Sequence, residues 1–178
     1  MPPPPRVLGR IVHHLCVVDR TRNIGRALAV AIAFAVPVLV AQDVAASGER
    51  IAHEEAVDRL AAVGIPWSSS GGCSDHVDPE CTSFEDIYSG TIDGVITLQR
   101  ASGCPIRVTG GTEAGHLPGR YSHEAGYKVD IALGDCVGDY IRSSFQEVPP
   151  PEFGTEAYRS AAGNEYTLES DHWDILYY

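Results

Sequence analysis

From residue 49 onward, the spacing of apolar and polar positions predicts helices first and strands after them. Apolar residues recur at helical spacing from 49 to 63, which predicts an amphipathic helix ended by Gly64 and Pro66. Apolar positions between 87 and 103 predict a further helix or a pair of helices. A short helix is expected from 136 to 145.

Strand-like segments follow these helices. Four segments are predicted to be strands: 106–109, 127–133, 165–169 and 173–178. The first leads into a glycine-rich loop, the last two meet at a tight turn, and 148–163 is expected to be a surface connection. The pattern predicts an α+β fold, a small single domain in which N-terminal helices pack on an antiparallel sheet.

The first 46 residues are predicted to be a leader that takes no part in this domain. Residues 27–41 form an apolar run preceded by Arg22 and Arg26. A membrane span needs about 20 apolar residues, whereas a basic flank, a short apolar core and a small-residue exit are typical of a signal peptide. Cleavage is expected near Ala46 or at the end of the run. The alternative is an uncleaved N-terminal membrane anchor.

Charge limits the partners of the domain at 47–178. The whole chain carries a net charge of −11, and from Ser47 onward there are 8 basic and 22 acidic residues. So acidic a surface repels phosphate backbones, which argues against a nucleic-acid partner. We expect a secreted, periplasmic or cell-wall protein that is a monomer and meets a membrane only through its leader, if that remains uncleaved.

Cysteine usage agrees with export. The domain has four cysteines, Cys73, Cys81, Cys104 and Cys136, and an even number is typical of disulfide-bonded exported proteins. Of the three pairings we favour 73–81 and 104–136, because Cys73 and Cys81 bracket one loop rich in Gly, Ser and Asp. A zinc site made of all four thiolates is the alternative, although no Cys-x-x-Cys pair is present.

Residues capable of metal chemistry gather in two clusters: His116, Ser122, His123 and Asp130, then Glu169, His172, Trp173 and Asp174. The helical zinc-protease motif HExxH is absent, so strands and loops must assemble any site. His123, Asp130 and His172 would leave the fourth position of a zinc ion open for water, as catalytic zinc sites do. Glu169 could take the proton from that water.

Two stretches of the chain, IRVTGGTEAGHLPGRYSHEAGYKVDI and ESDHW, resemble the metal-site segments of zinc peptidases that cleave peptidoglycan stem peptides. These are the D-alanyl-D-alanine carboxypeptidases and dipeptidases and the phage L-alanyl-D-glutamate endopeptidases. The stretches are also similar to the zinc-binding domain of hedgehog signalling proteins. The resemblance runs from about residue 106 to the C-terminus, apart from 134–164. It implies that His123, Asp130 and His172 bind zinc and that Glu169 is the general base.

The chain departs from the family pattern at three places. Tyr121 replaces the serine two residues before the first histidine, and Lys128 replaces the small residue two before the aspartate. The peptidases usually carry an arginine after the glycine turn, which steadies the substrate carbonyl. This chain has Gly-Thr-Glu at 111–113, with His116 or Arg120 as the residues that could substitute.

The sequence therefore predicts an exported zinc metallopeptidase that acts on short peptidoglycan stem peptides, as a carboxypeptidase or an endopeptidase. The alternative is a catalytically inactive, zinc-stabilised extracellular binding module of the hedgehog type. A polysaccharide-active protein with paired acids is a third idea, but no acidic pair is distinctive. Four residues are expected around the metal or the substrate: His116, Ser122, Trp173 and Asp174. For Trp173 we favour core packing over a place in the substrate cleft, and His53 and His76 are expected on the surface.

Overall fold

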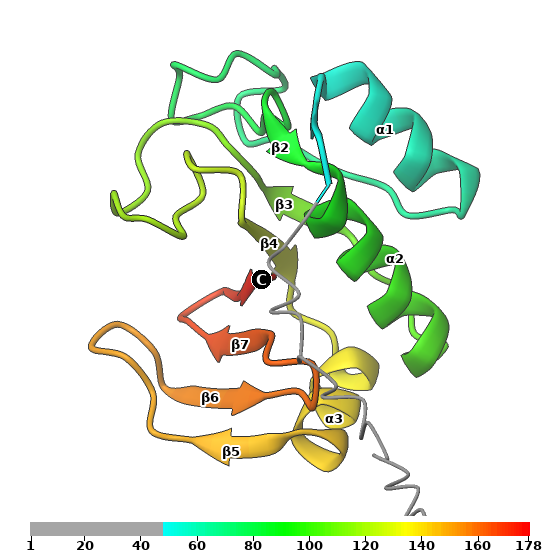
Figure 1. Ribbon diagram of the computed structural model, residues 1–178, viewed down its shortest axis with the longest axis vertical. Coiled ribbons are helices and arrows are strands. Elements are labelled where there is room, and N and C mark those ends of the chain that lie inside the picture. The colour runs from blue at the N-terminus through cyan, green and yellow to red at the C-terminus, as the bar shows by residue number, and fades with distance from the viewer. Residues whose placement is uncertain (1–47) are drawn as a thin grey trace, which may run out of the picture. The chain divides into compact units, whose positions relative to one another are not determined.

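The computed structural model describes residues 48–178, so the predicted leader and its cleavage site lie outside the described residues. Within them, three helices and a six-stranded antiparallel sheet confirm the predicted α+β class (Figure 1). The helices are α1 (His53–Ala62), α2 (Ser89–Ser102) and α3 (Asp135–Ser144). In spatial order the sheet contains β3 (Val108–Gly110), β4 (Lys128–Ala132), β8 (His172–Leu176), β7 (Glu165–Leu168), β6 (Glu156–Arg159) and β5 (Gln146–Val148).

The three predicted helices are confirmed, with ends that shift by a few residues. Before α1 and α2 the chain forms a small separate sheet of β1 (Arg50–Ile51) and β2 (Ile87–Tyr88). The segment from 87 to 103 therefore contains one helix, which ends at Gly103 in the left-handed conformation that glycine adopts without a steric penalty.

The four predicted strands are confirmed, but the expected surface connection at 148–163 is wrong in part. It contains β6, which pairs with β5 on one side and with β7 on the other. A strand of four residues has little pattern of its own, so pairing and burial decide its conformation rather than propensity. The remaining residues between β5 and β6 form the expected connection.

The core contains apolar side chains from the helices and from the sheet. Its largest member is Trp173, 1% exposed, which confirms the core alternative for this residue. The expectation that His53 lies on the surface is wrong. Its ring is buried and stacked on Phe84, and its Nδ1 accepts a hydrogen bond of 3.0 Å from the Phe84 N–H. His76 is exposed, as expected.

Two disulfides confirm the favoured pairing and exclude the four-thiolate zinc site. Cys73 bonds Cys81 within one loop, and Cys104 bonds Cys136, which joins the end of α2 to α3. Disulfides persist in oxidising compartments, so the pairing indicates an extracellular or otherwise oxidising location. From residue 48 onward no helix is long and apolar enough to cross a membrane.

Alternation along the central strands separates the core from a polar face. On β4, Val129 and Ile131 are buried in the core, and Asp130 between them points to the other face. Asp174 on β8 is directly opposite Asp130 in the antiparallel register. Two long connections, 111–127 and 149–155, project on the left of Figure 1, while the helices lie on the right.

Candidate metal centre

Asp130 is at the middle of the polar face. Its Oδ1 atom is buried and has no hydrogen-bond partner within the described part of the chain. Two imidazole nitrogens approach this oxygen, Nε2 of His123 at 3.3 Å and Nε2 of His172 at 3.4 Å. A buried carboxylate oxygen without a partner is costly, so this point of the molecule favours a positive charge.

A tight turn before β4 positions His123. Gly126, with φ of 79°, closes the turn through a hydrogen bond of 2.7 Å from its N–H to the His123 carbonyl. Ser122 is buried, and its hydroxyl accepts a backbone hydrogen bond within the same turn, so it shapes the turn. Nδ1 of His123 lies 2.7 Å from the Gly111 carbonyl. A carbonyl can only accept, so Nδ1 carries the proton and Nε2 of the neutral ring can bind a cation.

The turn between β7 and β8 positions His172 and Glu169. The Glu169 N–H donates to the His172 carbonyl at 3.0 Å, which holds the turn closed. Nδ1 of His172 lies 2.8 Å from Oδ1 of Asp171, and its Nε2 lies 3.6 Å from Oε2 of Glu169. Asp171 therefore orients the ring so that Nε2 faces Asp130.

His116 also reaches this site. His116, His123 and Asp130 offer ligand atoms that all lie within 4.8 Å of one another, so this His-His-Asp group can hold a metal ion. The His116 ring stacks on His123, with centroids 3.8 Å apart and planes 12° apart. Its Nε2 lies 3.1 Å from Oε1 of Glu113. The sequence placed His116 around the metal or the substrate, and the structure brings it against His123.

Two distances at Asp130 suit a tetrahedral metal ion. Zinc bonds to histidine nitrogen and carboxylate oxygen are about 2.0–2.2 Å long. In a tetrahedron of such bonds, neighbouring ligand atoms are about 3.3–3.6 Å apart. The two imidazole distances to Asp130 Oδ1, 3.3 and 3.4 Å, fall in that range. Asp130 Oδ1 can therefore share a metal ion with either nitrogen. Within the described residues, however, the group whose ligand atoms all lie within 4.8 Å of one another is His116, His123 and Asp130, and the predicted ligand His172 is not part of it.

The pKa values of the site show the same demand for positive charge. Burial alone lowers the pKa of the His123 imidazole, but the carboxylates of Asp130 and Asp174 raise it to about 10. Burial raises the pKa of Asp174, but His123 and Lys128 lower it to about 2. A proton on His123 thus balances two acids, and a bound metal ion would replace that proton.

The site opens into a pocket of about 380 Å³, lined by Gly115, His116, Leu117, His123, Lys128, Pro151, Phe153, Glu169, His172 and Asp174. Of the predicted surrounding residues, His116 and Asp174 line it, whereas Ser122 and Trp173 do not. Sequence reasoning missed Pro151 and Phe153, because they lie on the connection whose path depends on β6. Lys128 was visible only as a departure from the family pattern.

The residues at the position of the family arginine have a structural role. Thr112 and Glu113 are each 4% exposed. The Thr112 hydroxyl donates to the Glu85 carbonyl at 2.8 Å, and the Glu113 carboxylate accepts from the Ser83 N–H at 2.7 Å. Arg120 is exposed, its guanidinium lies over Tyr121, and it does not line the pocket.

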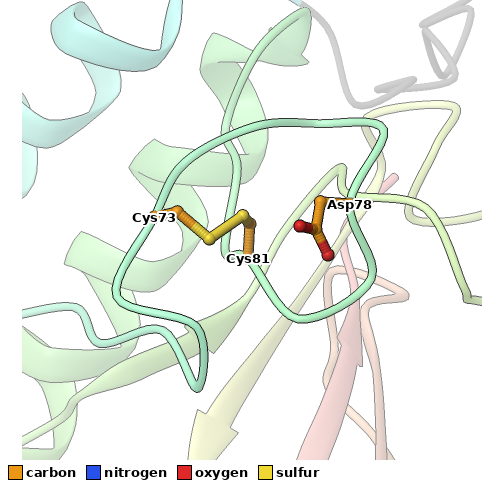
Figure 2. A group of neighbouring side chains, drawn as sticks. All are labelled: Cys73, Asp78 and Cys81. Atoms are coloured by element: carbon orange, nitrogen blue, oxygen red, sulfur yellow. A yellow bond between two sulfur atoms is a disulfide. The ribbon is translucent and has the colours of Figure 1, made fainter.

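A second group of potential ligands, Cys73, Asp78 and Cys81, is close together in the structure. Figure 2 shows that the two sulfur atoms are bonded to each other, with the Asp78 carboxylate beside them. Metals bind cysteine as the thiolate, so this oxidised group is no metal site.

No family model, curated protein or solved structure matches this chain. The resemblance to stem-peptide peptidases therefore stays a prediction that depends on the quoted motifs alone.

Proposed function

We propose that the domain is an exported zinc metallopeptidase that cleaves short peptidoglycan stem peptides. The observation that carries this proposal is the buried Oδ1 of Asp130, which has no hydrogen-bond partner among the described residues and has histidine nitrogens at 3.3 and 3.4 Å. Histidine and carboxylate are common zinc ligands. Both disulfides agree with an exported protein.

We infer that His123, Asp130 and His172 are the ligands and that His116 supports them. An imidazole binds a metal along a lone pair in the plane of its ring. The rings of His116 and His123 are nearly parallel, so in these orientations their lone pairs do not converge on one point, and a metal ion shared by both would require one ring to rotate. His172 approaches Asp130 Oδ1 from the β7–β8 turn instead, at a distance that suits a shared metal.

Glu169 is the proposed general base. Its carboxylate lines the pocket, and its Oε2 lies 3.6 Å from the metal-facing nitrogen of His172. A bound zinc ion supplies Lewis-acid polarisation of a substrate carbonyl and acidifies water in the site. Glu169 accepts the proton of the attacking water and passes it to the nitrogen of the leaving amine. One peptide bond breaks, and a carboxylate and an amine are formed.

The size of the pocket agrees with a short peptide. Its volume of about 380 Å³ lies in the range of small-ligand sites rather than of extended grooves. Leu117 and Phe153 supply apolar walls, and both side chains are exposed to solvent. The choice of stem peptides comes from the motif resemblance and from the exported location.

The second candidate is a zinc-stabilised binding module without turnover. One observation favours it. Thr112 and Glu113 occupy the place of the family arginine, are buried, and form hydrogen bonds with backbone groups. At that position the chain offers no cation to a substrate carbonyl. Metal binding is common to both candidates, and only turnover separates them.

The first test is the zinc content of the purified domain, measured by elemental mass spectrometry. The proposal expects about one zinc per chain, and Ala at His123, Asp130 or His172 should remove most of it. His116→Ala should retain zinc with an affinity about 10- to 100-fold lower, as expected for a supporting residue. Loss of zinc in His116→Ala with retention in His172→Ala would show that the stacked pair binds the metal.

The second test is hydrolysis of stem peptides that offer both D-Ala-D-Ala and L-Ala-D-Glu bonds, with and without a chelator. Glu169→Gln should keep zinc and fold, and should lower turnover by about 10²- to 10⁴-fold. Glu124→Gln, at an exposed position that does not line the pocket, is the matched control. Zinc-loaded wild-type protein without activity on any stem peptide would support the binding module.

A further inference from the structure

Lys128 is the single lysine of the sequence, and it lies on the wall of the candidate metal pocket. It precedes Asp130 by two residues on β4, so both side chains are on the same face of the sheet. Its Nζ donates to Oδ2 of Asp174 at 2.8 Å, and the same oxygen lies 3.4 Å from Nε2 of His123. The ammonium is thus one carboxylate away from a metal-facing nitrogen.

The ammonium has donors left for a ligand. A lysine ammonium carries three N–H donors, and within residues 48–178 the structure gives Lys128 one acceptor, Asp174. The side chain is 27% exposed and lines the pocket. Among the described residues that line this pocket, no other is a lysine or an arginine. An anionic group that enters would meet Lys128 as its cationic partner.

Asp174 holds the ammonium in place without closing it off. Asp174 is largely buried on β8, directly opposite Asp130, and the Lys128 stem reaches it diagonally across the strand pair. A lysine without such a partner samples many rotamers, and fixing them costs free energy on binding. The ion pair therefore preorganises Nζ beside the metal-facing atoms.

We propose that Lys128 binds the free C-terminal carboxylate of the peptide, so that the pocket selects peptides cut one residue from their C-terminus. This inference rests on the proposed peptidase function and gives its substrate class. In a peptide cut one residue from its C-terminus, the terminal carboxylate lies one residue beyond the scissile carbonyl. Neighbouring residues are about 3.8 Å apart. A peptide that continues further has a neutral amide at that place, which an ammonium binds less strongly than a carboxylate.

The test measures binding without turnover. Zinc-loaded protein carrying Glu169→Gln is titrated calorimetrically with N-acetyl-D-alanyl-D-alanine and with its C-terminal amide. The free acid should bind about 10- to 100-fold more tightly than the amide. Lys128→Met should abolish this preference, and Lys128→Arg should keep most of it. Equal affinity for acid and amide, a preference unchanged in Lys128→Met, or no binding of either peptide would overturn the inference.

Arg159→Met is the matched control. Arg159 forms an ion pair of 2.7 Å with Glu165 and does not line the pocket, so its loss changes net charge equally. It should leave the preference for the free acid unchanged. If Arg159→Met removes the preference as strongly as Lys128→Met does, general electrostatics explains it and the specific contact is wrong.

A second readout uses the uniqueness of the lysine. Amine acetylation followed by peptide mass analysis reports on Lys128 separately from the N-terminus. The free-acid peptide should protect Lys128, and the amide should not. Acid-dependent protection in a wild-type domain that cleaves nothing would keep the contact between Lys128 and the terminal carboxylate but would end the peptidase proposal. Cleavage of the free acid and the amide at equal kcat/KM would support the peptidase proposal and contradict the role of Lys128.

Discussion

The carboxylate of Asp130 sets the chemistry of the site at the residue scale. An isolated buried oxygen of a carboxylate requires a compensating charge. Within the described residues, two histidine nitrogens lie near Oδ1, but no group forms a hydrogen bond with it. A proton on His123 satisfies the charge, and a metal ion held by the His-His-Asp group would satisfy it as well.

Gly110 leaves the space that Asp130 needs. It pairs with Asp130 across β3 and β4, and a Cβ atom at position 110 would overlap the Asp130 carboxylate. Gly110→Ala should therefore displace that carboxylate, lower zinc affinity by about 10- to 100-fold, and destabilise the fold by about 1–3 kcal/mol. Zinc titration and urea denaturation measure the two effects.

The control for this substitution is Gly119→Ala, because no atom lies within 4 Å of a Cβ built there. It should change zinc affinity and stability little. If Gly110→Ala binds zinc as tightly as wild type, the carboxylate of Asp130 does not depend on this space and its proposed role as ligand is weakened.

At the scale of elements, a residue distant in sequence caps the start of α1. The N-cap residue Ala52 has no side chain that can accept a hydrogen bond, and Oε2 of Glu85 accepts from the His53 N–H at 3.1 Å instead. Helices leave their first N–H groups unpaired, so an acceptor there stabilises the helix start. The loop before β2 thus completes a helix that begins 32 residues earlier.

Glu85→Ala should lower the free energy of unfolding by about 1 kcal/mol, because it removes this cap. The backbone carbonyl of Glu85, which accepts from Thr112, is retained. Thermal or chemical denaturation measures the change, with Glu124→Ala at an exposed position as the control. A loss no larger than that of the control would mean that solvent caps α1 equally well.

At the scale of the whole molecule, the two disulfides have different tasks. Cys104–Cys136 closes a loop with a sequence separation of 32 and joins two helices, whereas Cys73–Cys81 closes one of 8. The short loop also supports the pocket, because the Ala114 N–H donates to the His76 carbonyl at 2.7 Å. His116 follows two residues after Ala114 on the same connection.

Replacing each disulfide with serine pairs should separate these tasks. By loop-closure entropy, loss of 104–136 should cost about 4 kcal/mol and loss of 73–81 about 2.5 kcal/mol. Zinc affinity should instead fall more in the 73–81 variant, because its loop supports the His116 connection. Denaturation and zinc titration of both variants provide the comparison. If the same variant shows the larger loss in both stability and zinc affinity, the two disulfides do not have separate tasks.

Local pattern determined much of the secondary structure and the residues of the candidate site. Helical spacing located the three helices, and alternation located the strand that carries Asp130, because both patterns reflect which side chains face a core. The last predicted strand began at Trp173, one residue after His172, where β8 begins. The bracketed loop of Cys73 and Cys81 was enough for the disulfide pairing. The motif clusters named His123, Asp130, His172 and Glu169, which the structure brings to one pocket wall or beside it.

Only the tertiary structure decided what depends on residues far apart in sequence. It paired β6 into the sheet, buried His53 against Phe84, and stacked His116 on His123. It also paired Lys128 with Asp174, 46 residues later. Lys128, which departs from the family motif, therefore lines the candidate binding pocket. Such contacts have no local signature, because they depend on strand register and loop paths that form only when the whole sheet is assembled.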